Sequence, residues 1–288
     1  IAQYKTFKLI FNNYRPLFVL VETDCFGALG PLIRAAKKSG IKTFSHTHGP
    51  IIYEMGHMPL LADKIFCWGK FQYDYFKRLG INKKDMFITG APHMREGLIG
   101  EKEIIKSKLK LDYEHIILIA SSNTYVKELI KIIINLLNVL PDNYCIIIRP
   151  HPVEDGQKYI DLTKNDRLKL FFDIELNAND SLLISDLVIV GNTAFLYDTV
   201  RMGRIPIIYK FEKTIYGEIN YLEKNDILPF AYDIKGLNRL IKDITQIDSE
   251  LKKWNSRIEK FKNSYWHAFN KSAANDIYKK LFNKQLSR

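Results

Sequence analysis

Cysteines and long apolar runs are both scarce in this sequence, and their scarcity excludes several classes of protein. Only three of the 288 residues are cysteines, Cys25, Cys67 and Cys145. They stand alone, in or beside apolar strand-like segments, so they indicate buried, reduced thiols in a cytoplasmic protein and not a disulfide framework. No group of cysteines and histidines has the spacing of metal ligands, so we expect no metal site. No apolar run reaches the ~18 residues that a membrane-spanning helix needs.

Internal repeats, low-complexity tracts and a signal peptide are also missing. The first residue is Ile1 and not Met, so we expect the chain to be a fragment, and the missing signal peptide then decides little. The chain has 288 residues, of which 47% are hydrophobic. That length and composition suffice for two globular domains, each with its own core.

Acidic residues are outnumbered by basic ones, 32 against 43, which gives a formal net charge of +11. Such a charge favours an anionic partner: nucleic acid, a membrane surface or a phosphorylated substrate. The lysines are spread along the chain and no usual nucleic-acid-binding motif is present, so we expect no nucleic-acid partner. A composition rich in Lys, Ile and Asn would also make the chain basic without any partner.

Strand-like apolar runs alternate with amphipathic segments along the whole chain. The clearest unit is Leu187–Val190, the turn 191–193, a helical segment over 194–202, and Ile205–Tyr209. This strand–helix–strand order predicts a parallel sheet covered on both faces. Further strands are predicted at 17–21, 41–45, 64–68, 86–89, 116–120, 144–148 and 168–172. Residues 227–231 form a short segment before the closing helices. Further helices are predicted at 1–14, 30–38, 71–79, 101–110, 126–140, 156–163, 236–262 and 272–284.

This alternation predicts an α/β fold made of two Rossmann-like domains. Residues 1–100 form the first, whose opening strands are missing, and residues 101–288 form the second, which includes the closing helices. The charged helix at 101–110 connects them. Ligands of such sheets bind beyond the carboxyl ends of the strands, so the functional residues are expected in the turns that follow the strands.

Four motifs carry a resemblance to a known family. They are RPHP at 149–152, SDLVIVGNTAFLYDTVRMGRIPIIY at 185–209, HGP at 48–50 and FNKSAA at 269–274. Together they resemble the CDP-glycerol glycerophosphotransferase and capsule-polysaccharide transferase families, whose architecture is that of GT-B glycosyltransferases. The resemblance covers the chain from about residue 17. Two positions depart from it: Asn192-Thr193 replaces a usual Ser pair, and Ile51 to Tyr53 stand where a Lys often follows the His-Gly turn.

The resemblance implies an enzyme that moves a sugar or a glycerol-phosphate-like unit from a nucleotide-activated donor, such as a nucleotide sugar, to a bacterial-type surface polysaccharide. The second domain would bind the nucleotide donor, and the first would offer the acceptor and a catalytic base. No metal or other cofactor is expected, because basic side chains and helix N-termini can stabilise a diphosphate.

Histidines at strand ends are the expected catalytic residues. His151 lies between two prolines that fix its backbone, so beside Arg149 it could bind a diphosphate or protonate a leaving group. His48 could act as general base, with His46 as an alternative or a supporting partner. Each could instead have a purely structural role. Further candidates for the base or the edge of the site are Glu22, Asp24 and His93.

Small polar side chains after two other strands are the expected donor-binding residues. Ser121, Ser122 and Asn123 follow one predicted strand, and Asn192 and Thr193 follow another. Both groups could hydrogen-bond phosphates at the start of a helix, and both could equally cap that helix. Asp198 could contact a ribose or support packing.

Two alternatives to a transferase stay open. A UDP-N-acetylglucosamine 2-epimerase shares the two-domain plan, but Leu196 and Tyr197 stand where its pair of glutamates would be. A non-catalytic module could use the same fold to hold a nucleotide or a polysaccharide.

The expected location is the cytoplasm, with peripheral contact at the anionic inner face of the plasma membrane, because the acceptor would be lipid-linked. Lysines in the closing helices suit such contact. They are Lys252, Lys253, Lys260, Lys262, Lys279, Lys280 and Lys284.

Overall fold

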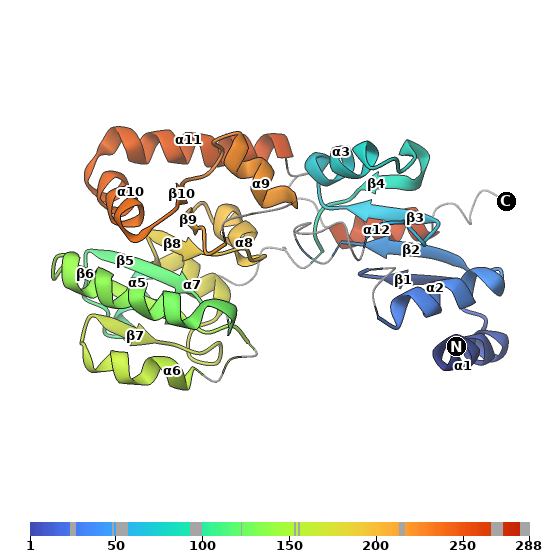
Figure 1. Ribbon diagram of the computed structural model, residues 1–288, viewed down its shortest axis with the longest axis horizontal. Coiled ribbons are helices and arrows are strands. Elements are labelled where there is room, and N and C mark those ends of the chain that lie inside the picture. The colour runs from blue at the N-terminus through green and yellow to red at the C-terminus, as the bar shows by residue number, and fades with distance from the viewer. Residues whose placement is uncertain are drawn as a thin grey trace. The chain divides into compact units, whose positions relative to one another are not determined.

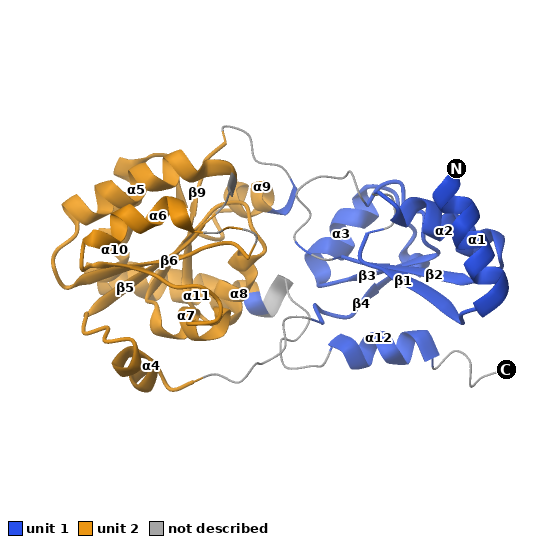
Figure 2. Ribbon diagram, turned by 90° about the horizontal axis from the view of Figure 1, so that it is seen from below, with its two compact units in different colours: residues 1–95, 216–218, 262–288 blue, residues 96–215, 219–261 orange. Residues whose placement is uncertain are grey.

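The computed structural model divides into two compact α/β units. Unit 1 comprises residues 1–95, 216–218 and 262–288, and unit 2 comprises residues 96–215 and 219–261 (Figure 2). The structure describes the chain except residues 24–26, 48, 50–56, 93–99, 122, 153, 155, 213–216, 266–272 and 283–288.

Unit 1 is built on a parallel sheet in the order β1-β2-β3-β4. Its strands are β1 (Phe18–Val21), β2 (Lys42–His46), β3 (Lys64–Cys67) and β4 (Met86–Ile88). Its helices are α1 (Ala2–Tyr14), α2 (Leu29–Lys38), α3 (Lys70–Arg78), the 3-10 turn η1 (Lys83–Asp85) and α12 (Ala273–Phe282). Figure 2 shows α1, α2 and α3 on one face of the sheet and α12 on the other.

The alternation of side chains along each strand explains these two layers. Val19 and Val21 of β1 pack with Phe11 of α1 and Ile33 of α2. The residues one position away face α12, where Phe44 and Phe66 stack with their ring centroids 5.6 Å apart and Ile277 packs against them.

The position of α12 differs from the expectation that both closing segments belong to the second domain. Phe282 lies edge-on to Phe18 at 5.4 Å, and the Lys280 ammonium lies 5.0 Å from the centre of the Phe87 ring. An amphipathic pattern shows that a helix has an apolar side, but it does not say which sheet that side covers.

Unit 2 is built on a six-stranded parallel sheet in the order β10-β9-β8-β5-β6-β7. Its strands are β5 (His115–Ala120), β6 (Tyr144–Arg149), β7 (Leu168–Leu170), β8 (Leu187–Val190), β9 (Ile205–Tyr209) and β10 (Phe230–Ala231). The strand order reverses between β5 and β8, so the topological switch point of a doubly wound sheet lies there. The α/β fold with parallel sheets that the sequence predicts is confirmed.

Helices and short turns connect the strands of unit 2 (Figure 1). They are α4 (Lys102–Lys108), η2 (Asn123–Tyr125), α5 (Val126–Val139), α6 (Gln157–Ile160), η3 (Asp161–Lys164), α7 (Ala178–Ile184), α8 (Phe195–Arg201), α9 (Gly217–Lys224), α10 (Ile234–Gln246) and α11 (Asp248–Tyr265).

Two features of this list differ from the prediction. The single helix expected at 236–262 is two helices, because Ile247 is extended and the acidic Asp248 and Glu250 suit a new helix start. Helix α9 was not predicted. No described helix is long and apolar enough to cross a membrane.

Candidate functional site

The candidate site lies at the carboxyl ends of four neighbouring strands of unit 2. Ser121 follows β5, the 149–152 motif ends β6, Gly191 to Thr193 follow β8, and Phe211 follows β9. These strands are adjacent in the order β9-β8-β5-β6, with the switch point in their middle. The structure describes four donor-binding candidates outside helices, and all four meet at this sheet edge together with His151: Arg149, Ser121, Asn192 and Thr193.

His151 is presented at the surface by its main chain. Its side chain is exposed, while its backbone N–H donates to Ser121 Oγ at 3.2 Å. The Ser121 backbone N–H in turn donates to the carbonyl of Arg149 at 3.0 Å. The ends of β5 and β6 are thus joined directly below an exposed imidazole.

A buried polar cluster lies under this junction. Ser121 donates its hydroxyl hydrogen to Glu154 Oε2, and Glu154 Oε1 lies 3.5 Å from Lys158 Nζ. Burial, together with the Glu154 carboxylate, raises the pKa of Tyr159 to about 12, although the Ser121 hydroxyl acts in the opposite direction. Glu154 is not among the residues predicted from the sequence, where its signal is an acid three residues after a strand-end histidine.

Arg149 is engaged within the protein. Its guanidinium donates to the Leu176 carbonyl at 2.9 Å and to Asp173 at 2.5 Å, and it lies 5.8 Å from the centre of the Phe195 ring. The side chain is 11% exposed. Arg149 therefore ties β6 to the segment before α7 and to the start of α8.

The turn after β8 combines an exposed amide with a side-chain hydrogen bond to the first residue of α8. Asn192 is exposed, whereas Thr193 Oγ1 accepts the Phe195 N–H at 3.3 Å. Asp198, one turn into α8, lies with a carboxylate oxygen 3.5 Å from Arg201 Nε. Asn192 is the member of this group that faces solvent.

Aromatic rings that the sequence analysis missed lie beside the switch point. Tyr125 and Phe211 stack in parallel, with centroids 4.7 Å apart and planes at 5°, and Tyr209 lies 4.9 Å from Phe211. A Cβ atom at Gly191 would come within 3.0 Å of the Phe211 ring, so a larger residue there would require the ring to shift. The signal in the sequence was an aromatic residue a few positions after each strand, since Tyr125 follows the end of β5 by five residues and Phe211 follows the end of β9 by two.

The candidates of unit 1 form a separate set. Glu22 is exposed after β1, and His46, at the end of β2, is half-buried with Nε2 3.4 Å from the Gly90 carbonyl oxygen. His48, Asp24 and His93 lie outside the described residues, as does Ser122 of unit 2. Asn123 falls in η2, where its side chain is not described.

A buried glutamine holds the residues on either side of position 48. Gln72 Oε1 accepts from Thr47 Oγ1 at 2.8 Å and from the Trp68 N–H at 2.9 Å, while Gln72 Nε2 donates to the Gly49 carbonyl at 3.3 Å. The Trp68 indole donates to the Thr47 carbonyl at 2.6 Å. The sequence analysis missed Gln72, because its position on α3 looks like an ordinary helix surface.

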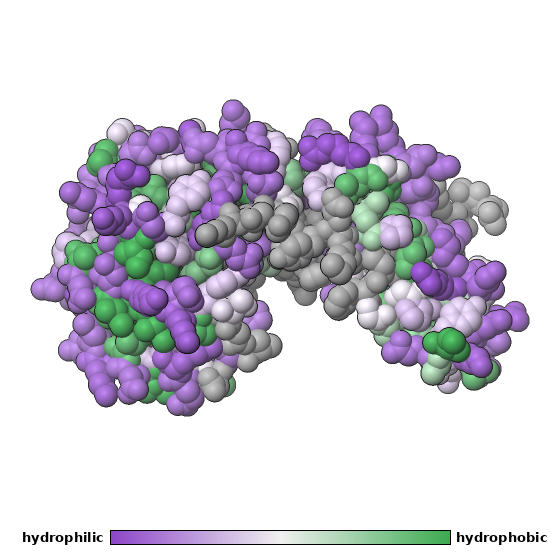
Figure 3. Space-filling view, viewed as in Figure 1, coloured by the Kyte–Doolittle hydropathy of each residue, from purple (hydrophilic) through white to green (hydrophobic). Residues whose placement is uncertain are grey.

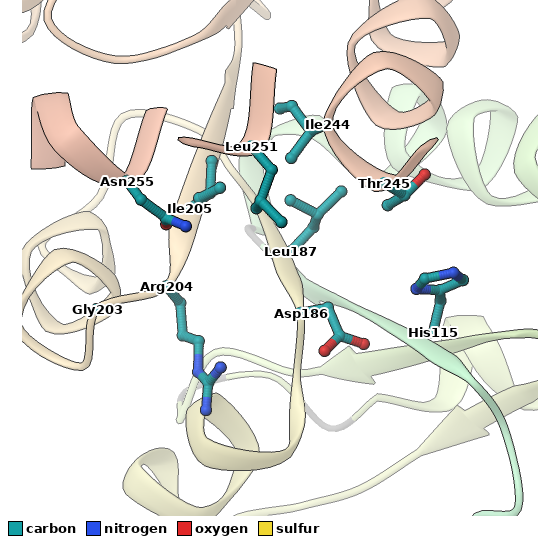
Figure 4. A pocket seen from close by; sticks show the side chains of 10 residues that line it. All are labelled: His115, Asp186, Leu187, Gly203, Arg204, Ile205, Ile244, Thr245, Leu251 and Asn255. Carbon is teal, nitrogen blue, oxygen red and sulfur yellow. The ribbon is translucent and has the colours of Figure 1, made fainter. Parts of the chain in front are cut away.

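A cavity of about 310 Å³ lies at the opposite, amino-terminal ends of β5, β8 and β9 (Figure 4). Its two charged side chains each make a hydrogen bond within the protein: Asp186 accepts the Ile116 N–H at 2.8 Å, and Arg204 donates to the Leu183 carbonyl at 2.6 Å. Burial lowers the pKa of Arg204, against the effect of Asp186. These contacts fix strand starts, so the cavity is not assigned to the candidate site. Among the described residues, no group of three or more His, Cys, Asp or Glu side chains could hold a metal ion.

Solved structures with the same fold include an epimerase-like protein and sugar transferases. The candidate UDP-N-acetylglucosamine 2-epimerase of Listeria monocytogenes is 15% identical, with a TM-score of 0.71 over 98% of this chain and 79% of that one. A glycosyltransferase of Rickettsia africae is 14% identical, with a TM-score of 0.59 over 97% and 80%. Anabaena Alr3699/HepE, solved in complex with UDP-glucose, is 11% identical, with a TM-score of 0.63 over 96% and 81%. At these identities the likeness establishes the fold: two Rossmann-like domains of the GT-B type.

No curated protein matches the sequence. A family profile, however, matches residues 72–283, which is more than half of the chain and includes every described candidate of unit 2. The resemblance found in the motifs is therefore confirmed over both the RPHP strand end and the turn after β8. The chain belongs to the CDP-Glycerol:Poly(glycerophosphate) glycerophosphotransferase family, a family of transferases.

Proposed function

We propose that this protein transfers a sugar or polyol-phosphate unit from a nucleotide-activated donor to a surface polysaccharide of the bacterial type, without a metal ion. One observation carries the proposal: the exposed His151, the exposed Asn192 and the Ser121 junction share the carboxyl edge at the switch point of unit 2. That edge is where doubly wound sheets bind nucleotides. The family's transfer of a glycerophosphate unit supports the choice of chemistry.

His151 has the position that the proposed reaction needs. An exposed imidazole on a proline-fixed main chain can hydrogen-bond a diphosphate and give its proton to the departing phosphate oxygen. Asn192 adds a neutral amide donor at the same sheet edge. Arg149 contributes indirectly, because two of its five donors hold the surrounding loops. His48 is proposed as the base that takes the proton of the acceptor hydroxyl, with His46 as the alternative.

The stacked rings of Tyr125 and Phe211 offer a place for the nucleobase. Bases stack on aromatic faces with a gain of about 1–3 kcal/mol in single-stranded nucleic-acid complexes. At a centroid distance of 4.7 Å nothing fits between the two rings, so a base would lie on an outer face of the pair. Gly191 keeps that pair next to the turn that carries Asn192.

Calorimetric titration with CDP, UDP and GDP tests the proposal. We expect binding of at least one nucleotide, and weaker binding after Asn192→Ala combined with Thr193→Ala. A hydrogen bond to a charged phosphate is worth about 1.5–3 kcal/mol, so the loss in affinity should be at least tenfold. Thr193→Ala alone controls for the loss of the hydrogen bond from the Phe195 N–H to Thr193 Oγ1. Failure of all three nucleotides to bind would contradict the proposal.

Assays on the same protein preparation distinguish a transferase from an epimerase and from a binding module. An epimerase would interconvert UDP-N-acetylglucosamine without an acceptor, but the positions of its acidic pair are held here by Leu196 and Tyr197, both buried. A binding module would take up the nucleotide without consuming the activated donor. We expect slow hydrolysis of the donor, because a transferase without its acceptor passes the group to water.

A further inference from the structure

The buried cluster under His151 has a fixed direction of hydrogen bonding. A serine hydroxyl has one hydrogen and two lone pairs. The hydrogen of Ser121 goes to Glu154 Oε2, and its oxygen accepts the His151 backbone N–H at 3.2 Å. Glu154 also closes the turn directly, since its backbone N–H donates to the His151 carbonyl at 2.7 Å. The main chain of His151 is thus held on both sides, and Glu154 takes part in both contacts.

Burial of the Glu154 carboxylate lowers the stability of the folded state. The Glu154 side chain is fully buried, and within the described part of the chain its Oε1 atom has no hydrogen-bond partner, although Lys158 Nζ lies 3.5 Å away. A buried polar atom without a hydrogen bond destabilises the folded state. The loop is also tightly packed: a Cβ at Gly156 would meet the Phe172 ring at 2.7 Å. A side chain that merely filled this space would be apolar, so the carboxylate points to a role in the site above it.

We propose that Glu154 is a positioning residue of the donor site, which acts on His151 through Ser121. By taking the Ser121 hydrogen, Glu154 leaves the serine oxygen to hold the His151 main chain, and this fixes where the imidazole meets the donor diphosphate. The inference rests on the proposed function. It also changes the role of Ser121: its hydroxyl supports His151 and is not itself a phosphate ligand.

A double-mutant cycle on nucleotide affinity tests this role. The variants are Ser121→Ala, Glu154→Leu and the two combined, and the probe is the nucleotide that the wild type binds best among CDP, UDP and GDP. A reacting group displaced by about 1 Å can lose up to about a hundredfold in function, so we expect each single variant to weaken binding about tenfold. The double variant should lose no more than either single variant, because both remove one shared contact.

Two further variants separate positioning from folding. Glu154→Gln keeps an oxygen that can accept the Ser121 hydrogen, so it should bind within about threefold of wild type, and it stays informative if Glu154→Leu does not fold. Tyr113→Phe removes a hydroxyl of unit 2 outside this cluster, one that donates to the Asp166 carbonyl at 3.0 Å, and should leave affinity unchanged. Melting temperatures identify variants that are merely unstable.

The possible outcomes test two separate claims, the positioning role of Glu154 and the proposed function. Additive losses, or a Ser121→Ala loss with Glu154→Leu unaffected, would make Ser121 a direct ligand and overturn the positioning role. Equal affinity in every folded variant would also overturn it. A wild type that binds none of the nucleotides would contradict the proposed function itself, which is a separate result.

Discussion

His151 combines an exposed side chain with a main chain held by Ser121 and Glu154. The imidazole therefore contributes little to packing, and its removal should affect chemistry far more than folding. We expect His151→Ala to lower the transfer rate by about 10²–10⁴-fold, the usual range for a general acid or base, with little change in melting temperature. A donor-consumption assay at saturating donor measures this. Full activity in a variant that melts like wild type would remove His151 from the mechanism.

The contribution of a single residue, Asp63, to the stability of the fold is expected to depend on pH. Burial by itself would raise its pKa, but the hydrogen bonds from Thr43 and Lys37 outweigh that effect and lower the pKa below 3.8. The Thr43 N–H and hydroxyl donate to Asp63 at 2.9 and 2.8 Å, and Lys37 Nζ lies 3.0 Å away. A lowered pKa means that the charged form stabilises the fold above pH 3.8, and that this contribution disappears as the pH falls further.

Urea unfolding of wild type and Asp63→Asn at several pH values tests whether the Asp63 carboxylate stabilises the fold more at neutral pH than in acid. At neutral pH the variant should have a smaller free energy of unfolding than wild type, and the gap should narrow as the pH falls below about 4. The carboxylate is 40% exposed, so solvent screening keeps the gap to about 1 kcal/mol or less. A gap that widens in acid would contradict the lowered pKa.

At the scale of elements, α12 shows how the closing part of the chain is distributed. Ile277 is 6% exposed in a cluster with Phe44 and Phe66 of unit 1. We expect Ile277→Ala to destabilise unit 1 by about 2–5 kcal/mol, as is usual for a buried Ile-to-Ala change. Hydrogen exchange should rise in β2 and β3 but not in β5 and β8.

A matched control lies on the same helix. Lys279 is exposed, so Lys279→Ala should change stability by about 0.5 kcal/mol or less. Faster exchange in β5 and β8 after Ile277→Ala would mean that α12 supports the sheet of unit 2 instead.

At the scale of the whole molecule, the net charge of +11 is the property most relevant to location. The face shown in Figure 3 is mostly hydrophilic, with hydrophobic side chains in small groups. Five lysines of the closing helices are exposed, namely Lys252, Lys253, Lys260, Lys279 and Lys280. Lys262 is half-buried, and Lys284 lies outside the described residues.

We expect the protein to sediment with anionic vesicles at low salt and to be released by high salt. Each basic side chain near such a surface is worth about 1 kcal/mol, and at 0.1 M salt the attraction extends only about 10 Å. Charge reversal of Lys252 and Lys260 on α11 should weaken sedimentation more than reversal of Lys127 and Lys131 on α5, which are also exposed and change the net charge equally. Equal sedimentation with neutral vesicles would contradict electrostatic docking.

The sheet edge that forms the candidate site could be predicted because its pattern is local. The apolar runs Leu187–Val190 and Ile205–Tyr209 were expected and are the strands β8 and β9. Parallel strands place their carboxyl ends at one edge, so Asn192 and His151 could be assigned to the same region without knowing the strand order. The break at Ile247 was missed because both flanking helices are amphipathic and no Gly or Pro separates them.

The amino-acid sequence by itself determined most of the elements, the parallel sheets and the family, because hydrophobic period, turn residues and motifs are properties of neighbouring residues. Tertiary structure alone decided the contacts between distant residues. The Glu154 carboxylate accepts the hydrogen of Ser121, next to His151. The Phe211 ring stacks on Tyr125. Helix α12 packs against the phenylalanines of unit 1. Such contacts depend on strand order and on which face each helix covers, and neither is recorded in the spacing of residues along the chain.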